Sequence, residues 1–336
     1  MKVFLAGTAG DGGWPETGCR CASCGRLPSQ HRRPFELVVD GVVRRFPFHR
    51  VPDGYLAFAR GYGLAGPDGR RLLCVPSGAS VPAEGAGPCD VVLIDLLDRP
   101  ERLGLLRRAG VVTGVTQVVA VGLDHRVRSE DELVRRLGLW GARAVPDGTT
   151  IDTAQPPPPP AGQARRSLVL GGSRSGKSAE AELRLAAEPH VTYVATGPTT
   201  GPSGDGEWAA RVAAHRDRRP AHWTTLETTD LAAAIRAATA PLLVDGLGTW
   251  LAAVFDEHGA WDGDRAPVEA RCDELVAAWR GAAQRIVAVS DEVGMGVVPA
   301  TSSGRAFRDA LGRLNERLAA ESEDVCVVIA GRLLPL

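Results

Sequence analysis

Gly171-Gly172-Ser173-Arg174-Ser175-Gly176-Lys177-Ser178 is the stretch that decides the fold of this 336-residue chain. It has the G-x-x-x-x-G-K-S spacing of a P-loop, whose glycines let backbone N–H groups turn toward the phosphates of a nucleotide. Lys177 is one of only two lysines among 39 lysines and arginines. A compact ammonium fits between the β- and γ-phosphates, where a guanidinium is too wide. We therefore predict that all eight residues bind nucleotide and that the Ser178 hydroxyl binds Mg²⁺.

The segments on either side of this loop support the prediction. Residues 167–170 form a short apolar run, typical of a buried strand, and residues 179–187 are rich in helix-forming Ala, Glu, Leu and Arg. The order strand, loop, helix directs the helix N-terminus at the phosphates. The alternative is a glycine-rich turn that matches the spacing by chance, and it does not account for both flanks.

Composition limits the class of protein. The net charge of −1 gives no reason to expect nucleic acid or an anionic membrane as a partner. We find no apolar run near the roughly 20 residues of a membrane span, and the first six residues predict a strand rather than a signal peptide. Seven cysteines is an odd number, which disfavours a secreted disulfide framework and favours a reducing, cytoplasmic location.

The length suggests two domains, and a run of five prolines at Pro156–Pro160 predicts an extended linker between them. We divide the chain into residues 1–150, a Pro-rich linker at 151–165, and residues 166–336. In the last part, apolar strands are predicted at 167–170, 191–195, 241–245, 286–290 and 325–329. Helices are predicted between them at 177–187, 207–217, 230–238, 249–255, 267–283 and 304–320. This alternation predicts an α/β fold with a mostly parallel sheet, helices on both faces, and ligands at the carboxyl ends of the strands.

Acidic residues follow two of these strands. Asp245 ends the run Pro241-Leu-Leu-Val-Asp, and in P-loop enzymes such an acid holds Mg²⁺ directly or through water. Its alternative role is to cap the next helix. Asp291 and Glu292 follow the strand at 286–290, where metal, sugar and base roles or a solvated turn all remain open.

A histidine lies on an arginine-rich segment that is predicted to be helical. Arg211 and His215 are four residues apart, so they share one helix face. A neutral imidazole can attack phosphorus, and arginines can hold phosphate oxygens through paired hydrogen bonds. From these residues alone, an exposed surface histidine is the simpler interpretation.

The order of several motifs resembles a known family. The P-loop is followed by Val194-Ala-Thr-Gly197, then by residues 210–223 (ARVAAHRDRRPAHW), then by Leu243-Val-Asp245. Residues 291–299 (DEVGMGVVP) and 305–309 (RAFRD) follow. Together these motifs resemble the bifunctional adenosylcobinamide kinase / adenosylcobinamide-phosphate guanylyltransferase family over about residues 166–336. The chain departs from the family pattern at Asp291, where many members have Asn, and at Gly246 and Gly248, which lie in a region where larger residues are common.

The resemblance implies two reactions in assembling the nucleotide loop of cobalamin. ATP or GTP phosphorylates adenosylcobinamide, and GTP then transfers GMP to that phosphate through a guanylyl-histidine, giving adenosylcobinamide-GDP. It implies that His215 is this histidine and that His222 is not. It also implies that Lys177 is catalytic, that Arg211, Glu227 and Asp245 bind the nucleotide, and that the protein is a homo-oligomer such as a trimer.

The N-terminal part carries a cysteine cluster. Cys19, Cys21 and Cys24 have C-x-C-x-x-C spacing, which could hold one structural Zn²⁺ with a fourth ligand such as His125. The alternative is three free thiols in an early loop.

Residues 1–150 also resemble metallo-β-lactamase-fold hydrolases of the phosphodiesterase type, at a glycine-rich strand end near the N-terminus and at residues 122–148. The H-x-H-x-D-H metal motif of that fold is absent from the sequence. We therefore interpret this part as a smaller α+β, shortened and degenerate relative without catalysis. Two other functions remain to be distinguished. One is a P-loop regulatory NTPase with an N-terminal zinc-binding module, and the other is a zinc hydrolase.

Overall fold

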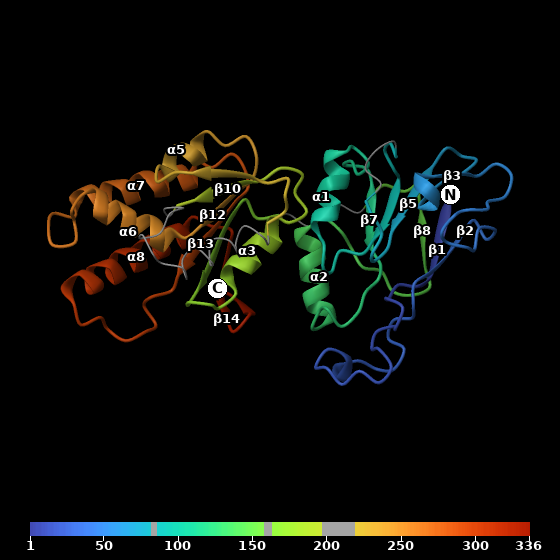
Figure 1. The fold of residues 1–336 in the computed structure, drawn as a ribbon, viewed down its shortest axis with the longest axis horizontal. Helices are drawn as coiled ribbons and strands as arrows, with labels where there is room; N and C mark the ends of the chain where they lie inside the picture. Colours follow the sequence, from blue (N-terminus) through green and yellow to red (C-terminus); the bar gives the residue numbers. More distant parts are fainter. Residues whose placement is uncertain (82–85, 158–162, 197–218) are drawn as a thin grey trace, which may run out of the picture. The chain divides into compact units, whose positions relative to one another are not determined.

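The computed structural model describes residues 1–81, 86–157, 163–196 and 219–336. The chain divides into two compact units, Met1–Gln163 with Ala186–Pro189 and Ala164–Leu185 with His190–Leu336. Figure 1 labels the helices and strands of both units.

The C-terminal unit is built on one sheet with the strand order β11-β10-β12-β13-β9-β14-β15. Neighbouring strands are parallel except for β14 and β15, which are antiparallel. The strands are β9 (Arg166–Gly171), β10 (Thr192–Ala195), β11 (Thr224–Glu227), β12 (Leu242–Asp245), β13 (Ile286–Asp291), β14 (Asp324–Ile329) and β15 (Arg332–Pro335). The helices are α3 (Lys177–Leu185), α5 (Leu231–Arg236), α6 (Leu247–Glu257), α7 (Ala266–Arg280) and α8 (Ser302–Ala320).

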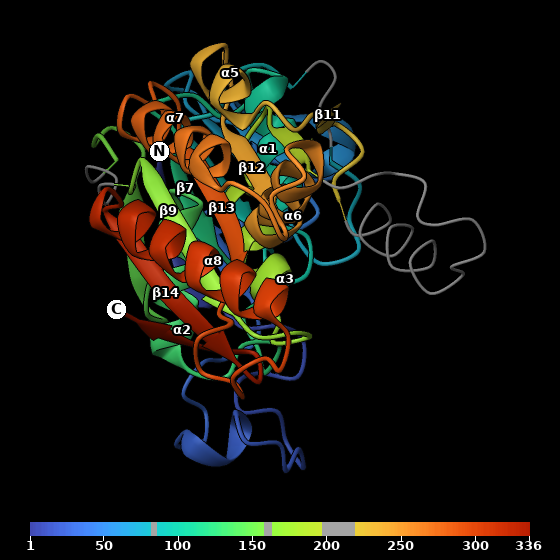
Figure 2. The ribbon, with the colours of Figure 1, turned by 90° about the vertical axis from the view of Figure 1, so that its left-hand side faces the viewer.

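Alternate residues of the buried strands face two different helical layers. Leu168 and Leu170 of β9 pack in one core with side chains of α5, α6, α7 and α8, whereas Val169 packs in a second core with side chains of α3. Figure 2 faces the first layer, with α6, α7 and α8 in front of the strands. Burial on both faces explains why the strands are continuous apolar runs. The predicted parallel sheet with helices on both faces is therefore confirmed.

Two strands at the edges of the sheet were not predicted. The residues of β11 are exposed and carry no apolar pattern, and β15 is a short antiparallel strand after a tight turn with exposed residues. A strand at the edge of a sheet can remain largely exposed, so its sequence shows only a weak apolar pattern. The helix predicted at residues 207–217 lies outside the described residues.

The N-terminal unit packs two sheets against each other. One has the order β2-β1-β8 and the other β3-β4-β5-β6-β7, and side chains from both, including Leu5 and Leu93, share one core. The strands are β1 (Lys2–Gly7), β2 (Glu36–Val39), β3 (Leu56–Phe58), β4 (Gly63–Ala65), β5 (Arg71–Val75), β6 (Val91–Ile94), β7 (Gln117–Ala120) and β8 (Thr149–Asp152). Its helices are α1 (Glu101–Arg108) and α2 (Glu130–Leu139), with short 3₁₀ turns at Cys24–Arg26 and Ala59–Gly61. Asp152 of β8 pairs with Lys2, so this sheet continues past residue 150.

Candidate functional site

The P-loop connects the carboxyl end of β9 to the first turn of α3. Gly171 must lack a side chain, because a Cβ there would lie 2.7 Å from the carbonyl oxygen of Val328. Gly176 has φ +99°, a conformation that other residues rarely adopt. These two glycines shape the turn, and Lys177 follows directly as the first residue of α3.

Lys177 is 8% exposed and has two oxygen partners. Its Nζ donates to the carbonyl oxygen of Gly172 at 3.1 Å and forms an ion pair with Asp291 Oδ1 at 2.8 Å. Asp291 ends β13 and pairs in register with Gly171. A Cβ at Gly248 would lie 2.8 Å from Asp291 Oδ2. Asp291 and Gly248, which both depart from the family pattern, are therefore neighbours, and the missing side chain at residue 248 leaves room for the Asp291 carboxylate.

Asp245 lies on β12, which is separated from β9 by β13. Its Oδ1 accepts a hydrogen bond from Ser178 Oγ at 3.1 Å, and its Oδ2 accepts one from Tyr193 Oη at 2.9 Å. Burial and the charge of Asp245 raise the pKa of Tyr193 above its ordinary value. The sequence left open that Asp245 caps the next helix, but the N-cap residue of that helix, α6, is Gly246. Tyr193 was not predicted as a site residue, because its role follows from the strand order and not from any local motif.

The Ser178 hydroxyl and the Asp245 carboxylate fit a Mg²⁺ site. Both are oxygen donors of the kind this ion prefers, and it commonly binds through one or two such protein groups together with substrate phosphates. They meet at the carboxyl edge of the sheet beside the P-loop, which is where ligands bind in open α/β folds.

The other predicted nucleotide ligands differ in where they lie. Glu227 ends the edge strand β11 and is in register with Ala195, which in turn pairs with Asp245. It therefore lies at the same edge of the sheet, but on the outermost strand. Arg211 and His215 lie outside the described residues. His222 is described, and it is partly buried.

The cysteine cluster of the N-terminal unit is brought together with a histidine. One possible ligand atom from each of Cys19, Cys21, Cys24 and His125 lies within 4.8 Å of the others. Burial raises the pKa of Cys24 to about 11, whereas a hydrogen bond from the backbone N–H of Cys24 lowers the pKa of Cys21. Three sulfurs and one imidazole are a donor set typical of structural zinc. These residues fit such an ion.

The loop that carries these cysteines is held by buried side chains. Ser23 Oγ accepts a hydrogen bond from Trp14 Nε1 at 3.1 Å and donates one to the carbonyl oxygen of Val127 at 2.7 Å. Trp14 is fully buried. The contacts fix Ser23 near the segment that contains His125, so the ligand arrangement does not depend on a metal alone.

A separate group of carboxylates lies at the ends of β6 and β7. Arg126 forms ion pairs with Asp95 at 3.0 Å, with Asp98 at 2.7 Å and with Asp124 at 2.8 Å. One guanidinium thus pairs with all three of these acids. Among the described residues, one set of three or more His, Cys, Asp or Glu side chains has ligand atoms close enough together to hold a metal ion. This set is the cluster of Cys19, Cys21, Cys24 and His125.

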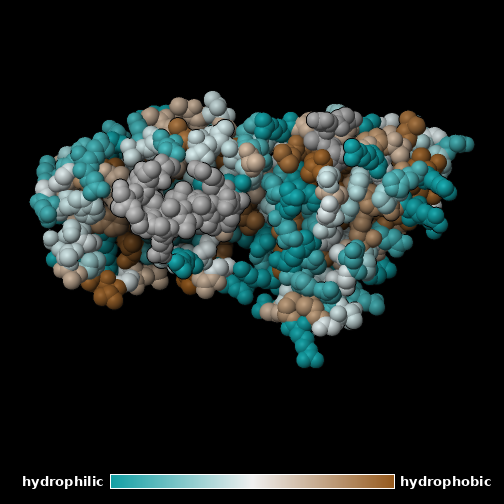
Figure 3. All heavy atoms as spheres, viewed as in Figure 1, coloured by the Kyte–Doolittle hydropathy of each residue, from teal (hydrophilic) through white to brown (hydrophobic). Residues whose placement is uncertain are grey.

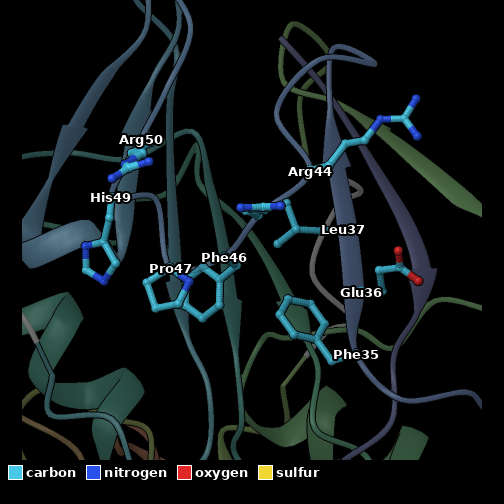
Figure 4. Close-up of a pocket in the computed structure, with 9 residues that line it drawn as sticks. Phe35, Glu36, Leu37, Arg44, Phe46, Pro47, His49 and Arg50 are labelled. Atoms are coloured by element: carbon cyan, nitrogen blue, oxygen red, sulfur yellow. The ribbon is translucent and has the colours of Figure 1, made fainter.

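The N-terminal unit also contains a hollow of about 530 Å³ between β2 and the segment that follows it. Figure 4 shows Phe35 and Phe46 in its middle, with His49 and Arg50 on one side and Glu36 on the other. The two phenyl rings meet edge to face, with centroids 6.2 Å apart. All of its lining residues belong to the N-terminal unit.

The sheet, the P-loop and the acids beside it define a P-loop nucleotide-binding enzyme. Comparison with known proteins narrows this class. The family model described as cobinamide kinase / cobinamide phosphate guanyltransferase matches residues 167–336. The chain therefore belongs to this family, as its motifs predicted.

Curated relatives agree with the family match. A bifunctional adenosylcobalamin biosynthesis protein CobU of Salmonella typhimurium is 40% identical over 49% of this chain and 95% of its own length. The protein CobP of Pseudomonas aeruginosa, with the same description, is 43% identical over 51% of this chain and 96% of its own length. CobU of Escherichia coli is 36% identical over 49% of this chain and 95% of its own length. The prediction of a bifunctional transferase of cobalamin biosynthesis is thereby confirmed.

No helix of the described residues is long and apolar enough to cross a membrane.

Proposed function

We propose that residues 166–336 carry out both reactions at the nucleotide site built around the P-loop. The observation that carries this proposal is that Lys177 and the Ser178–Asp245 pair lie together at one edge of the sheet. Lys177 and the N–H groups of the loop would hold the phosphates and stabilise the charge that develops on their oxygens.

In the first reaction, the hydroxyl of adenosylcobinamide attacks the γ-phosphorus of ATP or GTP, and the nucleoside diphosphate leaves. The work of the protein in this step is positioning and electrostatic stabilisation. Ser178 and Asp245 would hold Mg²⁺, which when bound neutralises phosphate charge. Lys177 Nζ forms an ion pair with Asp291, so this carboxylate competes with a phosphate oxygen for the Lys177 ammonium.

In the second reaction, we assign the nucleophile to His215 from the family motif. A neutral imidazole nitrogen attacks the α-phosphorus of GTP and pyrophosphate leaves. A phosphate oxygen of adenosylcobinamide phosphate then attacks the same phosphorus, and the histidine leaves. Arg211 and Glu227 are the further nucleotide ligands that this proposal includes.

GTP labelled at the α-phosphate tests this assignment. The wild-type protein and the His222→Ala variant should retain an acid-labile label, and His215→Ala should lose it. His215→Ala should also accumulate adenosylcobinamide phosphate without forming adenosylcobinamide-GDP, because the P-loop remains intact. A labelled His215→Ala protein with normal product formation would contradict the covalent mechanism.

The same experiment separates the enzyme from a P-loop regulatory NTPase, which would hydrolyse nucleotide without a covalent guanylyl group. Parallel assays with ATP and GTP identify the phosphoryl donor. Sedimentation tests the predicted oligomer, including the trimer, and fractionation of cells tests the cytoplasmic location.

We further propose that Cys19, Cys21, Cys24 and His125 bind one structural Zn²⁺ in the N-terminal unit. Their donor atoms and their mutual distances support this. Metal analysis of the purified chain should find about one zinc per chain, and Cys21→Ser should lower that content and the melting temperature. Two zinc ions per chain would instead support the hydrolase alternative.

A further inference from the structure

The connection between β13 and α8 presents apolar side chains to solvent. Met295 is 78% exposed, Val297 is 94% exposed and Val298 is 62% exposed. We refer to residues 293–299 as the apolar loop. Figure 3 shows hydrophobic colour at the lower left of the C-terminal unit, where Figure 1 draws this connection. Three large apolar side chains exposed within four residues are more than scattered surface hydrophobics and are typical of a contact surface.

The apolar loop begins at the rim of the phosphate site. Asp291, the last residue of β13, forms the ion pair with Lys177. The backbone N–H of Glu292 donates to the carbonyl oxygen of Gly171, the first P-loop residue, at 3.2 Å. The apolar loop therefore starts directly beside the P-loop, at the end of β13.

The backbone of the apolar loop is anchored at both ends by α8. Arg308 Nη2 donates to the carbonyl oxygen of Gly294 at 2.6 Å, and Arg305 Nη1 donates to those of Pro299 and Ala300 at 3.0 Å and 2.7 Å. Val293 packs on the core of the unit. The exposed side chains are thus presented by a loop that is already ordered, which lowers the entropy lost when a partner binds.

We propose that Met295, Val297 and Val298 form the contact surface for the apolar periphery of the corrin ring during phosphorylation. This rests on the proposed function, which brings a hydroxyl on one arm of cobinamide to the phosphate held by Lys177. Reacting atoms must approach to roughly 3–3.5 Å, so the rest of this large ligand must extend over the rim. Residues 293–300 carry no charge. Their apolar, uncharged side chains are better suited to contact the methyl groups of a corrin than to contact an anionic nucleotide.

The test is the double substitution Val297→Ser/Val298→Ser in the full chain, assayed for cobinamide phosphorylation. We expect the KM for cobinamide to rise on the order of tenfold, as the loss of apolar contacts in a binding surface does. The kcat and the KM for nucleotide should not change, because serine adds no charge near the phosphates. The matched control is Val115→Ser, which alters a valine that is 76% exposed in the N-terminal unit, and it should leave all constants unchanged.

An unchanged KM for cobinamide in the double variant would overturn the inference. A rise in the KM for nucleotide would also overturn it, since the loop would then act through the P-loop. Light scattering provides a further check. If the double variant dissociates an oligomer, the occupant of the loop is a second copy of the chain and not the corrinoid. A wild-type protein that does not phosphorylate cobinamide would instead refute the proposed function.

Discussion

Replacing Asp291 by Asn should tighten nucleotide binding. In the wild-type protein, the Asp291 carboxylate competes with phosphate oxygens for the Lys177 ammonium, and an asparagine amide competes less. At the observed separation of 2.8 Å, two unit charges attract by about 6 kcal/mol at an effective dielectric constant of ~20. The Asp291 side chain is 41% exposed, and exposed pairs retain only about 1 kcal/mol after screening. Removing this competition should lower the Kd for nucleotide about fivefold.

The assay is titration with a fluorescent, non-hydrolysable GTP analogue at low and high salt. Glu292→Gln is the matched control, because it removes the same charge one residue along. Glu292 Oε1 accepts a hydrogen bond from the backbone N–H of Gly294, and Lys177 pairs with Asp291. The Asn variant should bind more tightly and lose part of the salt dependence, whereas the control should resemble the wild type. Equal effects of both substitutions, or weaker binding by the Asn variant, would refute the reasoning.

Substitutions at Lys177, Asp245 and Gly171 test the phosphate site further. Lys177→Ala should abolish phosphoryl transfer, and Lys177→Arg should fail as well because the guanidinium is too wide for the loop; near-normal kinase activity of the Arg variant would contradict this. Asp245→Asn should lower activity in a way that raised Mg²⁺ partly restores, and an unaltered Mg²⁺ dependence would remove Asp245 from the metal site. Gly171→Ala should cost about 1–3 kcal/mol of unfolding free energy, measured by denaturant titration, because its Cβ would lie 2.7 Å from the carbonyl oxygen of Val328. Gly172→Ala is its control, since no atom lies within 4 Å of a Cβ there, and equal losses in the two variants would contradict the steric explanation.

The sequence by itself determined the features whose cause is local. The P-loop consists of eight consecutive residues, and the spacing of its glycines and lysine is enough to predict a phosphate-binding loop. The buried strands are apolar runs because both of their faces are covered. The order of short motifs was enough to indicate the family, which the comparisons confirmed. The cysteine spacing likewise placed three possible zinc ligands in one loop.

Tertiary structure alone decided which distant residues meet. Ser178 and Asp245 are separated by 67 residues, and Cys24 and His125 by 101. The contact of Lys177 with Asp291 exists because β13 lies between β9 and β12. The order of parallel strands in a sheet is set by how the connecting helices pack, and no local pattern encodes it. For this reason the sequence left the role of Asp291 open and gave no sign of Tyr193, whereas the fold places both beside the phosphate site.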